Sequence, residues 1–125
     1  MIIPVQITFR HLAHSLSMTE AIQAEAEKLN QFFERITSCR VLVEGADVHQ
    51  RPAHKIHVRI ELGVPGKELV VNYQGELHGG ELGSEASETG EQGYTVVHEA
   101  FKAMRRQLQD YATRLRAEVK LHVGK

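Results

Sequence analysis

The chain has 125 residues, of which 42% are hydrophobic and 25% are charged, and its formal net charge is −1. This size and composition fit one soluble globular domain, and no apolar run approaches the roughly 18 residues that a membrane span needs. The single cysteine, Cys39, excludes an internal disulfide and a zinc site built from several cysteines. The N-terminal residues lack the basic and apolar stretches of an export signal, so we expect a cytoplasmic protein.

The N-terminal third of the chain predicts a strand followed by a helix. Residues 5–10 alternate between apolar and polar side chains, which is the period of a strand with one covered face. The string Ser17-Met18-Thr19-Glu20 has the spacing of a capping box, so a helix is expected to begin there and to run to about Phe33, with Glu25 on its outer face. Its apolar stripe consists of Ile22, Ala26, Leu29, Phe32 and Phe33.

Three further strands are predicted in the middle of the chain. Residues 39–44, which include Cys39 and the apolar residues 41–43, predict the second strand. Residues 56–62 alternate and predict the third, and residues 68–73 predict the fourth. The alternation in 56–62 indicates a sheet with one face in water. Pro65 and Gly66 predict a tight connection between the last two strands, because proline fixes φ at one corner and glycine accepts a positive φ at the next.

Residues 74–93 are predicted to form a mobile, acidic, glycine-rich loop. They hold five glutamates and neither Lys nor Arg, and they contain few bulky side chains that could offset the entropy of ordering. Residues 94–125, by contrast, hold seven Lys or Arg against three acids. The nearly neutral net charge of the chain is therefore the sum of an acidic segment and a basic segment. This separation of charge is compatible with a nucleic-acid surface on the folded part.

A long final helix is predicted by apolar residues that recur every three or four positions. These are Tyr94, Val97, Phe101, Met104, Leu108, Tyr111 and Leu115. Both helices need a covering surface, and only one sheet is available. We therefore expect a single domain over residues 1–125 with an α+β fold, in the order βαβββα, in which a four-stranded sheet carries two helices packed on one face.

One flank of the final helix is basic, and this flank is the candidate RNA-binding surface. Its principal cations are Lys102, Arg105, Arg106 and Arg116, and the secondary candidates elsewhere are Arg10, Lys28, Lys55 and Arg59. Phosphate backbones are bound by such cations through the release of counterions, without a need for base sequence. The alternative interpretation is an ordinary solvated helix face.

The sequence offers little support for a metal site or an enzyme active site. His54 and His57 are three residues apart, so on a strand they point to opposite faces, and no metal site is expected. No phosphate loop, dinucleotide fingerprint or nucleophile motif occurs, so we expect neither an enzyme nor a bound cofactor or small-molecule substrate. The apolar seam of the final helix could alternatively receive a partner helix, as in a coiled coil.

Several strings, in this order of elements, resemble the ribosome hibernation factors, the family of protein Y (ribosome-associated inhibitor A) and of the short hibernation promoting factor. The matching strings are Glu91 to Val97, Met104 to Leu108 followed by Tyr111, Thr19 to Ile22, Glu27 to Leu29, and Thr8 to His11. Two positions depart from the family pattern, since Ala103 stands where the family usually has Lys and Phe9 where it has Gly. The acidic loop is also unusually long.

The resemblance implies a non-catalytic factor that binds the small ribosomal subunit and its rRNA in the decoding channel. There it would block messenger and transfer RNA and store idle ribosomes under stress and in stationary phase. The chain ends at Lys125, so we expect it to lack the additional C-terminal domain of the family's long forms. The alternative function is an RNA-binding or helix-mediated interaction module that regulates another assembly.

Overall fold

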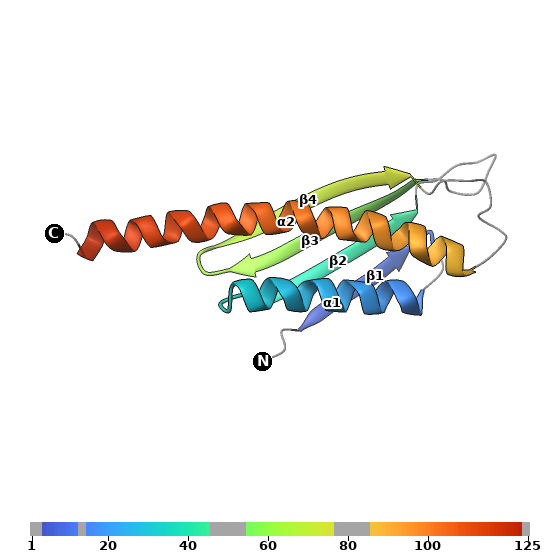
Figure 1. Cartoon of the computed structure of the whole chain (residues 1–125), viewed down its shortest axis with the longest axis horizontal. Coiled ribbons are helices and arrows are strands. Elements are labelled where there is room, and N and C mark those ends of the chain that lie inside the picture. The colour runs from blue at the N-terminus through green and yellow to red at the C-terminus, as the bar shows by residue number, and fades with distance from the viewer. Residues whose placement is uncertain (1–3, 13–14, 46–54, 77–85, 124–125) are drawn as a thin grey trace.

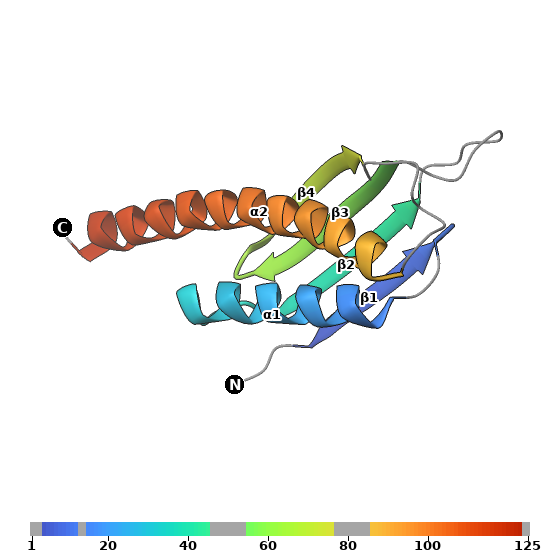
Figure 2. The ribbon, with the colours of Figure 1, turned by 45° about the vertical axis from the view of Figure 1, so that its right-hand side comes forward.

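The computed structural model describes residues 4–12, 15–45, 55–76 and 86–123, with side chains for 4–12, 15–45, 56–75 and 95–117. It has the α+β order that the sequence predicted, with four strands and two helices. The elements are β1 (Val5–Arg10), α1 (Leu16–Phe32), β2 (Ser38–Gly45), β3 (Lys55–Val64), β4 (Lys67–Glu76) and α2 (Ala86–Val123). Both helices lie on the same face of the sheet, and α2 extends past one end of it (Figures 1 and 2).

The sheet is mixed, with the strands in the spatial order β1-β2-β3-β4. Strand β1 runs parallel to β2, and the crossover between them contains α1. The other two pairs are antiparallel. Strands β3 and β4 are joined at Pro65 and Gly66, and the φ of 84° at Gly66 is the positive value expected there.

The core lies between the sheet and the helices. Strand β3 directs every second side chain toward the helices. On α2, four residues of the predicted apolar seam are buried, namely Val97, Phe101, Met104 and Leu108. Cys39 on β2 is also buried, and its burial raises the pKa of the thiol to about 12. The thiol is therefore neutral at physiological pH and acts as a small apolar side chain.

Helix α1 begins two residues earlier than predicted. Its N-cap is Ser15, whose hydroxyl oxygen accepts a hydrogen bond from the backbone N–H of Met18 at 3.2 Å. The predicted capping box starting at Ser17 is therefore wrong. The earlier start places Met18, which is buried, one turn before Ile22 on the inner face.

The predicted loop over residues 74–93 is also too long. Residues 74–76 belong to β4, where Gln74 and Gly75 pair with His57 and Ile56. Backbone hydrogen bonds of a ladder do not require bulky side chains, which is why composition missed this extension. Residues 86–93 belong to α2, because a helix propagates readily from an end that is already formed. The remainder of the predicted loop, residues 77–85, lies outside the described residues.

Gly75 allows the last part of β4 to approach α2 closely. A Cβ atom at this position would lie 2.7 Å from Cγ2 of Val96, which is buried and, as a β-branched residue on a helix, has little rotamer freedom. We expect Gly75→Ala to destabilise the fold by about 1 to 3 kcal/mol, measured by urea denaturation. The double variant Gly75→Ala/Val96→Ala removes the clash, so its loss should be smaller than the sum of the single losses. Strictly additive losses would contradict this packing.

Candidate nucleic-acid interface

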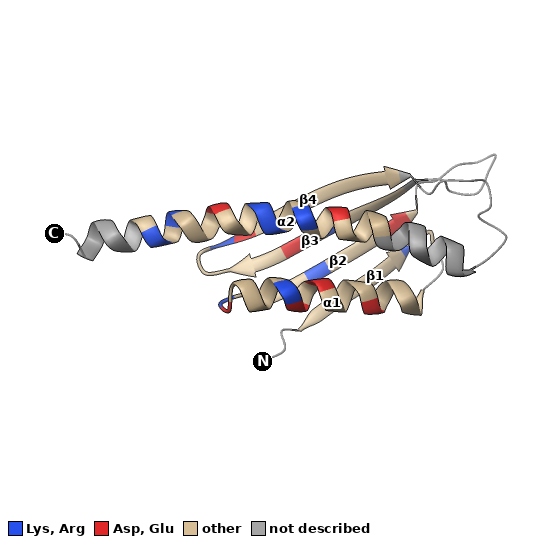
Figure 3. Cartoon of the chain, in the orientation of Figure 1, with Lys and Arg blue, Asp and Glu red and all other residues tan. Residues whose placement is uncertain are grey.

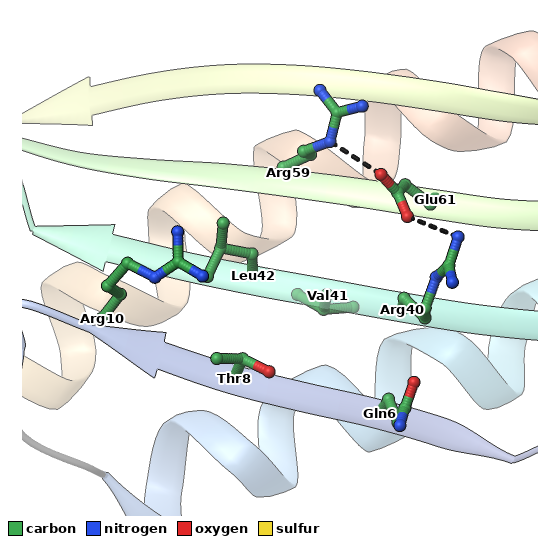
Figure 4. Close-up of a pocket in the computed structure, with 8 residues that line it drawn as sticks. All are labelled: Gln6, Thr8, Arg10, Arg40, Val41, Leu42, Arg59 and Glu61. Carbon is green, nitrogen blue, oxygen red and sulfur yellow. Dashed lines mark hydrogen bonds and ion pairs between the residues drawn. The ribbon is translucent and has the colours of Figure 1, made fainter.

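The structure divides the predicted RNA-binding residues between two faces of the molecule. Lys28 lies on α1, while Lys102, Arg105, Arg106 and Arg116 lie on α2. Figure 3 shows Lys and Arg positions on both helices in blue. Arg10 on β1 and Arg59 on β3 lie on the opposite, open face of the sheet (Figure 4). Lys55 is the first residue of β3, and its side chain is outside the described part. The seven candidates whose side chains the structure describes therefore form two separate groups rather than one surface.

A groove between the two helices brings three of these cations together. Its volume is about 120 Å³, and it is lined by Glu25, Lys28, Leu29, His98, Phe101, Lys102 and Arg105. Lys28 comes from α1, whereas Lys102 and Arg105 lie three residues apart on α2 and so share a helix face. We call this feature the helix groove. The basic flank that the sequence placed on one helix is thus extended by a cation from the other.

Most of the helical cations are available to a ligand. Lys102, Arg106 and Arg116 are exposed, and none forms an ion pair with a residue that the structure describes. Arg116 is eleven positions beyond Arg105, which is about 16 Å along a helix. The exposed cations therefore form a row along α2 with the spacing of a few phosphates, and binding there would not first require the rupture of internal salt bridges.

Glu25 lies at the floor of the helix groove, which corrects its predicted outward position. It is only 6% exposed, and its Oε2 lies 3.0 Å from Nδ1 of His98 and 3.8 Å from Nζ of Lys28. Its position three residues after Ile22 puts it at the border of the apolar stripe, and burial of a carboxylate is tolerated where partners surround it. Glu25 therefore links α1 to α2 beneath the cations.

The open face of the sheet contains a hollow of about 320 Å³ with a different charge character. It is lined by Gln6, Thr8, Arg10, Arg40, Val41, Leu42, Arg59 and Glu61 (Figure 4). Nη2 of Arg40 contacts Oε1 of Glu61 at 2.8 Å and Oε2 of Glu68 at 2.9 Å. Nε of Arg59 donates to Oε2 of Glu61 at 2.8 Å. Two of the three arginines at this hollow are therefore already paired with carboxylates.

Pairing with the two arginines lowers the pKa of the Glu61 carboxyl group. The hydrogen bond from Arg59 is the largest effect and lowers the pKa of the Glu61 carboxyl below its usual value; burial opposes it, and the charges of Arg40 and Arg59 lower the pKa further. Glu61 is consequently ionised at neutral pH and remains a partner of both guanidinium groups. An incoming phosphate would have to compete with Glu61 for them.

Sequence reasoning missed Arg40 as a member of the open face. The signal was present, since Arg40 alternates with the buried residues Cys39 and Val41 and must therefore point away from the helices. Its partners could not be deduced, because Arg40 lies directly opposite Glu61 only through the antiparallel register of β2 and β3.

A metal site and a membrane-spanning helix are both absent from the described residues. No group of three His, Cys, Asp or Glu side chains there is arranged to hold a metal ion. The described helices include none with the length and apolar character needed to cross a membrane.

The described residues form a small α+β domain, in which a mixed four-stranded sheet is covered on one face by two helices that carry exposed cations. The family model described as Sigma 54 modulation protein / S30EA ribosomal protein matches residues 5–116, and the chain belongs to this family. The family resemblance drawn from the short sequence strings is thereby confirmed. A search of curated proteins returned no significant match.

Solved structures show the same fold. A ribosomal subunit interface protein from Coxiella burnetii is 13% identical, with a TM-score of 0.64 over 87% of this chain and 97% of that one. The N-terminal domain of Protein Y from Thermus thermophilus is 14% identical, with a TM-score of 0.61 over 89% of this chain and 99% of that one. At these identities the likeness concerns the architecture and not the individual side chains.

Proposed function

We propose that this protein is a cytoplasmic ribosome hibernation factor, which binds the small ribosomal subunit in its decoding channel and keeps messenger and transfer RNA out. The observation that carries the proposal is the row of exposed cations on α2, where Lys102, Arg106 and Arg116 form no ion pair with a described residue, in a chain that belongs to the S30EA family. A solved structure with the same fold is described as a ribosomal subunit interface protein, which supports a ribosomal partner.

The helical surface is the proposed principal contact with rRNA. Ribosomal RNA presents a dense array of phosphates, and a rigid helix with free Lys and Arg gains affinity by displacing condensed counterions. Lys28, Lys102, Arg105, Arg106 and Arg116 have this role. Arg10, Lys55 and Arg59 are assigned a secondary role, because Arg59 is held by Glu61 and by Oδ1 of Asn72 at 3.2 Å on the open sheet face.

Inhibition by occupancy requires no chemical step. The protein acts as an obstacle, so its inhibition of translation should follow its binding to the small subunit and should yield to ligands that use the same channel. We accordingly propose no enzymatic activity, cofactor or small-molecule substrate for it. Storage of idle ribosomes during stress or stationary phase is the physiological role that fits a reversible obstacle.

An order-of-addition experiment tests channel blocking. Protein preincubated with vacant ribosomes should strongly slow cell-free synthesis, whereas protein added to ribosomes that already hold message and initiator transfer RNA should have much less effect. The matched binding measurement is co-sedimentation with 30S particles in the presence or absence of initiator transfer RNA. Stable co-binding with that transfer RNA, or equal inhibition in both orders, would reject the channel and favour an adaptor that binds elsewhere through α2.

A further inference from the structure

Phe32 is an exposed aromatic residue beside the helix groove. The exposed large hydrophobic residues in the described part are Leu16 at 68% and Phe32 at 40%, at opposite ends of α1. The adjacent Phe33 has a packing role, because its ring meets the ring of Tyr111 edge-to-face at a centroid distance of 5.6 Å. Phe32 is not among the residues of the core, so its exposure has no structural explanation in the packing of α1.

The exposed ring is paired with a cation of the groove. The guanidinium carbon of Arg105 lies 5.4 Å from the centroid of the Phe32 ring, within the range of a cation–π contact. Arg105 also lines the helix groove, so the contact joins the ring to that groove. Lys28 and Lys102 line the same groove, and both are exposed. An aromatic ring, a planar cation and two ammonium groups therefore lie at one place.

We propose that Phe32 and Arg105 form a stacking site for one unpaired RNA base, whose neighbouring phosphates are bound by Lys28 and Lys102. The proposal rests on the proposed function in so far as the partner is RNA, and it specifies which form of RNA is bound. Unpaired bases stack on aromatic rings and on guanidinium planes, and both surfaces are present here. Bases inside a duplex are already stacked on each other and cannot use such a site.

The charges at the site favour RNA over an apolar protein segment. Three exposed cations, Lys28, Lys102 and Arg105, line the groove, and the acidic residue that lines it, Glu25, is buried against His98 and Lys28. An apolar segment docked there would leave Lys102 partly desolvated without an opposite charge, because Glu25 is already paired with His98 and Lys28, and such desolvation is costly. A nucleotide supplies both a flat π-face and a phosphate, so it satisfies the ring and the cations together.

The absence of tryptophan from the chain allows a direct test. Phe32→Trp introduces a single fluorophore at the stacking site, and Leu16→Trp introduces the same fluorophore at the other end of α1. Single-stranded oligoadenylate should quench the fluorescence of Phe32→Trp, whereas an abasic oligonucleotide with the same number of phosphates should not. Leu16→Trp should be quenched by neither. Equal quenching of Phe32→Trp by both oligonucleotides would overturn the inference.

Affinity measurements supply the second test. Phe32→Ala should weaken binding of single-stranded oligoadenylate by about tenfold and leave binding of an RNA duplex nearly unchanged, whereas Phe32→Tyr should retain the affinity. Arg105→Lys keeps the charge and loses the planar group, so it should weaken oligoadenylate binding without changing its salt dependence. Leu16→Ala is the control and should behave as wild type. An unchanged affinity of Phe32→Ala would reject the stacking site.

Co-sedimentation with 30S particles separates this inference from the proposed function. One possible result is that the wild type binds 30S particles and that Phe32→Ala binds oligoadenylate as well as the wild type does. This result would reject the stacking site and leave the ribosomal function in place. Loss of 30S binding in Phe32→Ala with unchanged oligoadenylate binding would assign Phe32 to a contact with a ribosomal protein, which also overturns the inference. Base-dependent quenching without any 30S binding would support the stacking site and reject the hibernation role.

Discussion

The double variant Arg105→Glu/Arg106→Glu is expected to bind the 30S subunit on the order of 100-fold more weakly than the wild type. Two charge-assisted contacts with phosphates would be lost, and each is worth about 1.5 kcal/mol or more, so the total of about 3 kcal/mol corresponds to that factor. The reversed charges add repulsion, which makes 100-fold a lower estimate. Both residues are exposed, so the variant should fold normally, as checked by circular dichroism and thermal unfolding.

The salt dependence of the same variant identifies the origin of the loss. The slope of log affinity against log salt should become shallower by about two units, because each phosphate contact contributes close to one unit. Lys67→Glu is the matched control, since Lys67 is an exposed cation at the start of β4 that does not line the helix groove. Unchanged affinity and slope in the double variant, with an intact fold, would show that the basic flank of α2 is only solvated surface.

The largest effect on stability is expected for Phe101→Ala. Phe101 is 2% exposed and belongs to the face of α2 that packs on the sheet. Truncation of a buried phenylalanine to alanine costs about 3 to 5 kcal/mol, through lost burial and the cavity that remains. Because domains of this kind are stable by only about 5 to 15 kcal/mol, the variant should lose a large part of its stability.

Thermal and urea unfolding measure this loss. The melting temperature of Phe101→Ala should fall by roughly 15 °C, since about 1 kcal/mol corresponds to a few degrees in a domain of this length. Phe32→Ala removes the same side chain from a site that is 40% exposed, so it should cost at most about 1 kcal/mol. Similar losses in the two variants would mean that α2 does not pack through the seam that contains Phe101.

The sequence by itself determined the order of elements, the inner face of β3 and the inner face of α2. These features follow from periodicity, because alternation on a strand and three-to-four spacing on a helix depend only on backbone geometry. The turn at Gly66 was predicted for the same reason, since its positive φ is a local requirement. The cations of α2 were likewise placed together on one flank by helical geometry alone.

Tertiary structure decided every feature that joins residues distant in the chain. Glu25 was assigned to the outer face because its partner, His98, is 73 positions away. Arg40 was overlooked because its partners, Glu61 and Glu68, are brought to it by strand register. Lys28 joined the cations of α2 only when the two helices packed side by side on the sheet.

The physical reason for this division is the range of the interactions involved. The spacing of apolar residues indicates which side chains of a helix or strand are buried, and this spacing is visible within one segment of the chain. The pairing of charges and the exposure of Phe32 beside Arg105 depend on how separate segments of the chain pack against each other. The packing of the whole core fixes how separate segments lie against each other. Only the folded molecule therefore distinguishes the helical surface, where Lys102, Arg106 and Arg116 form no ion pair with a described residue, from the sheet surface, where Arg40 and Arg59 are paired with carboxylates.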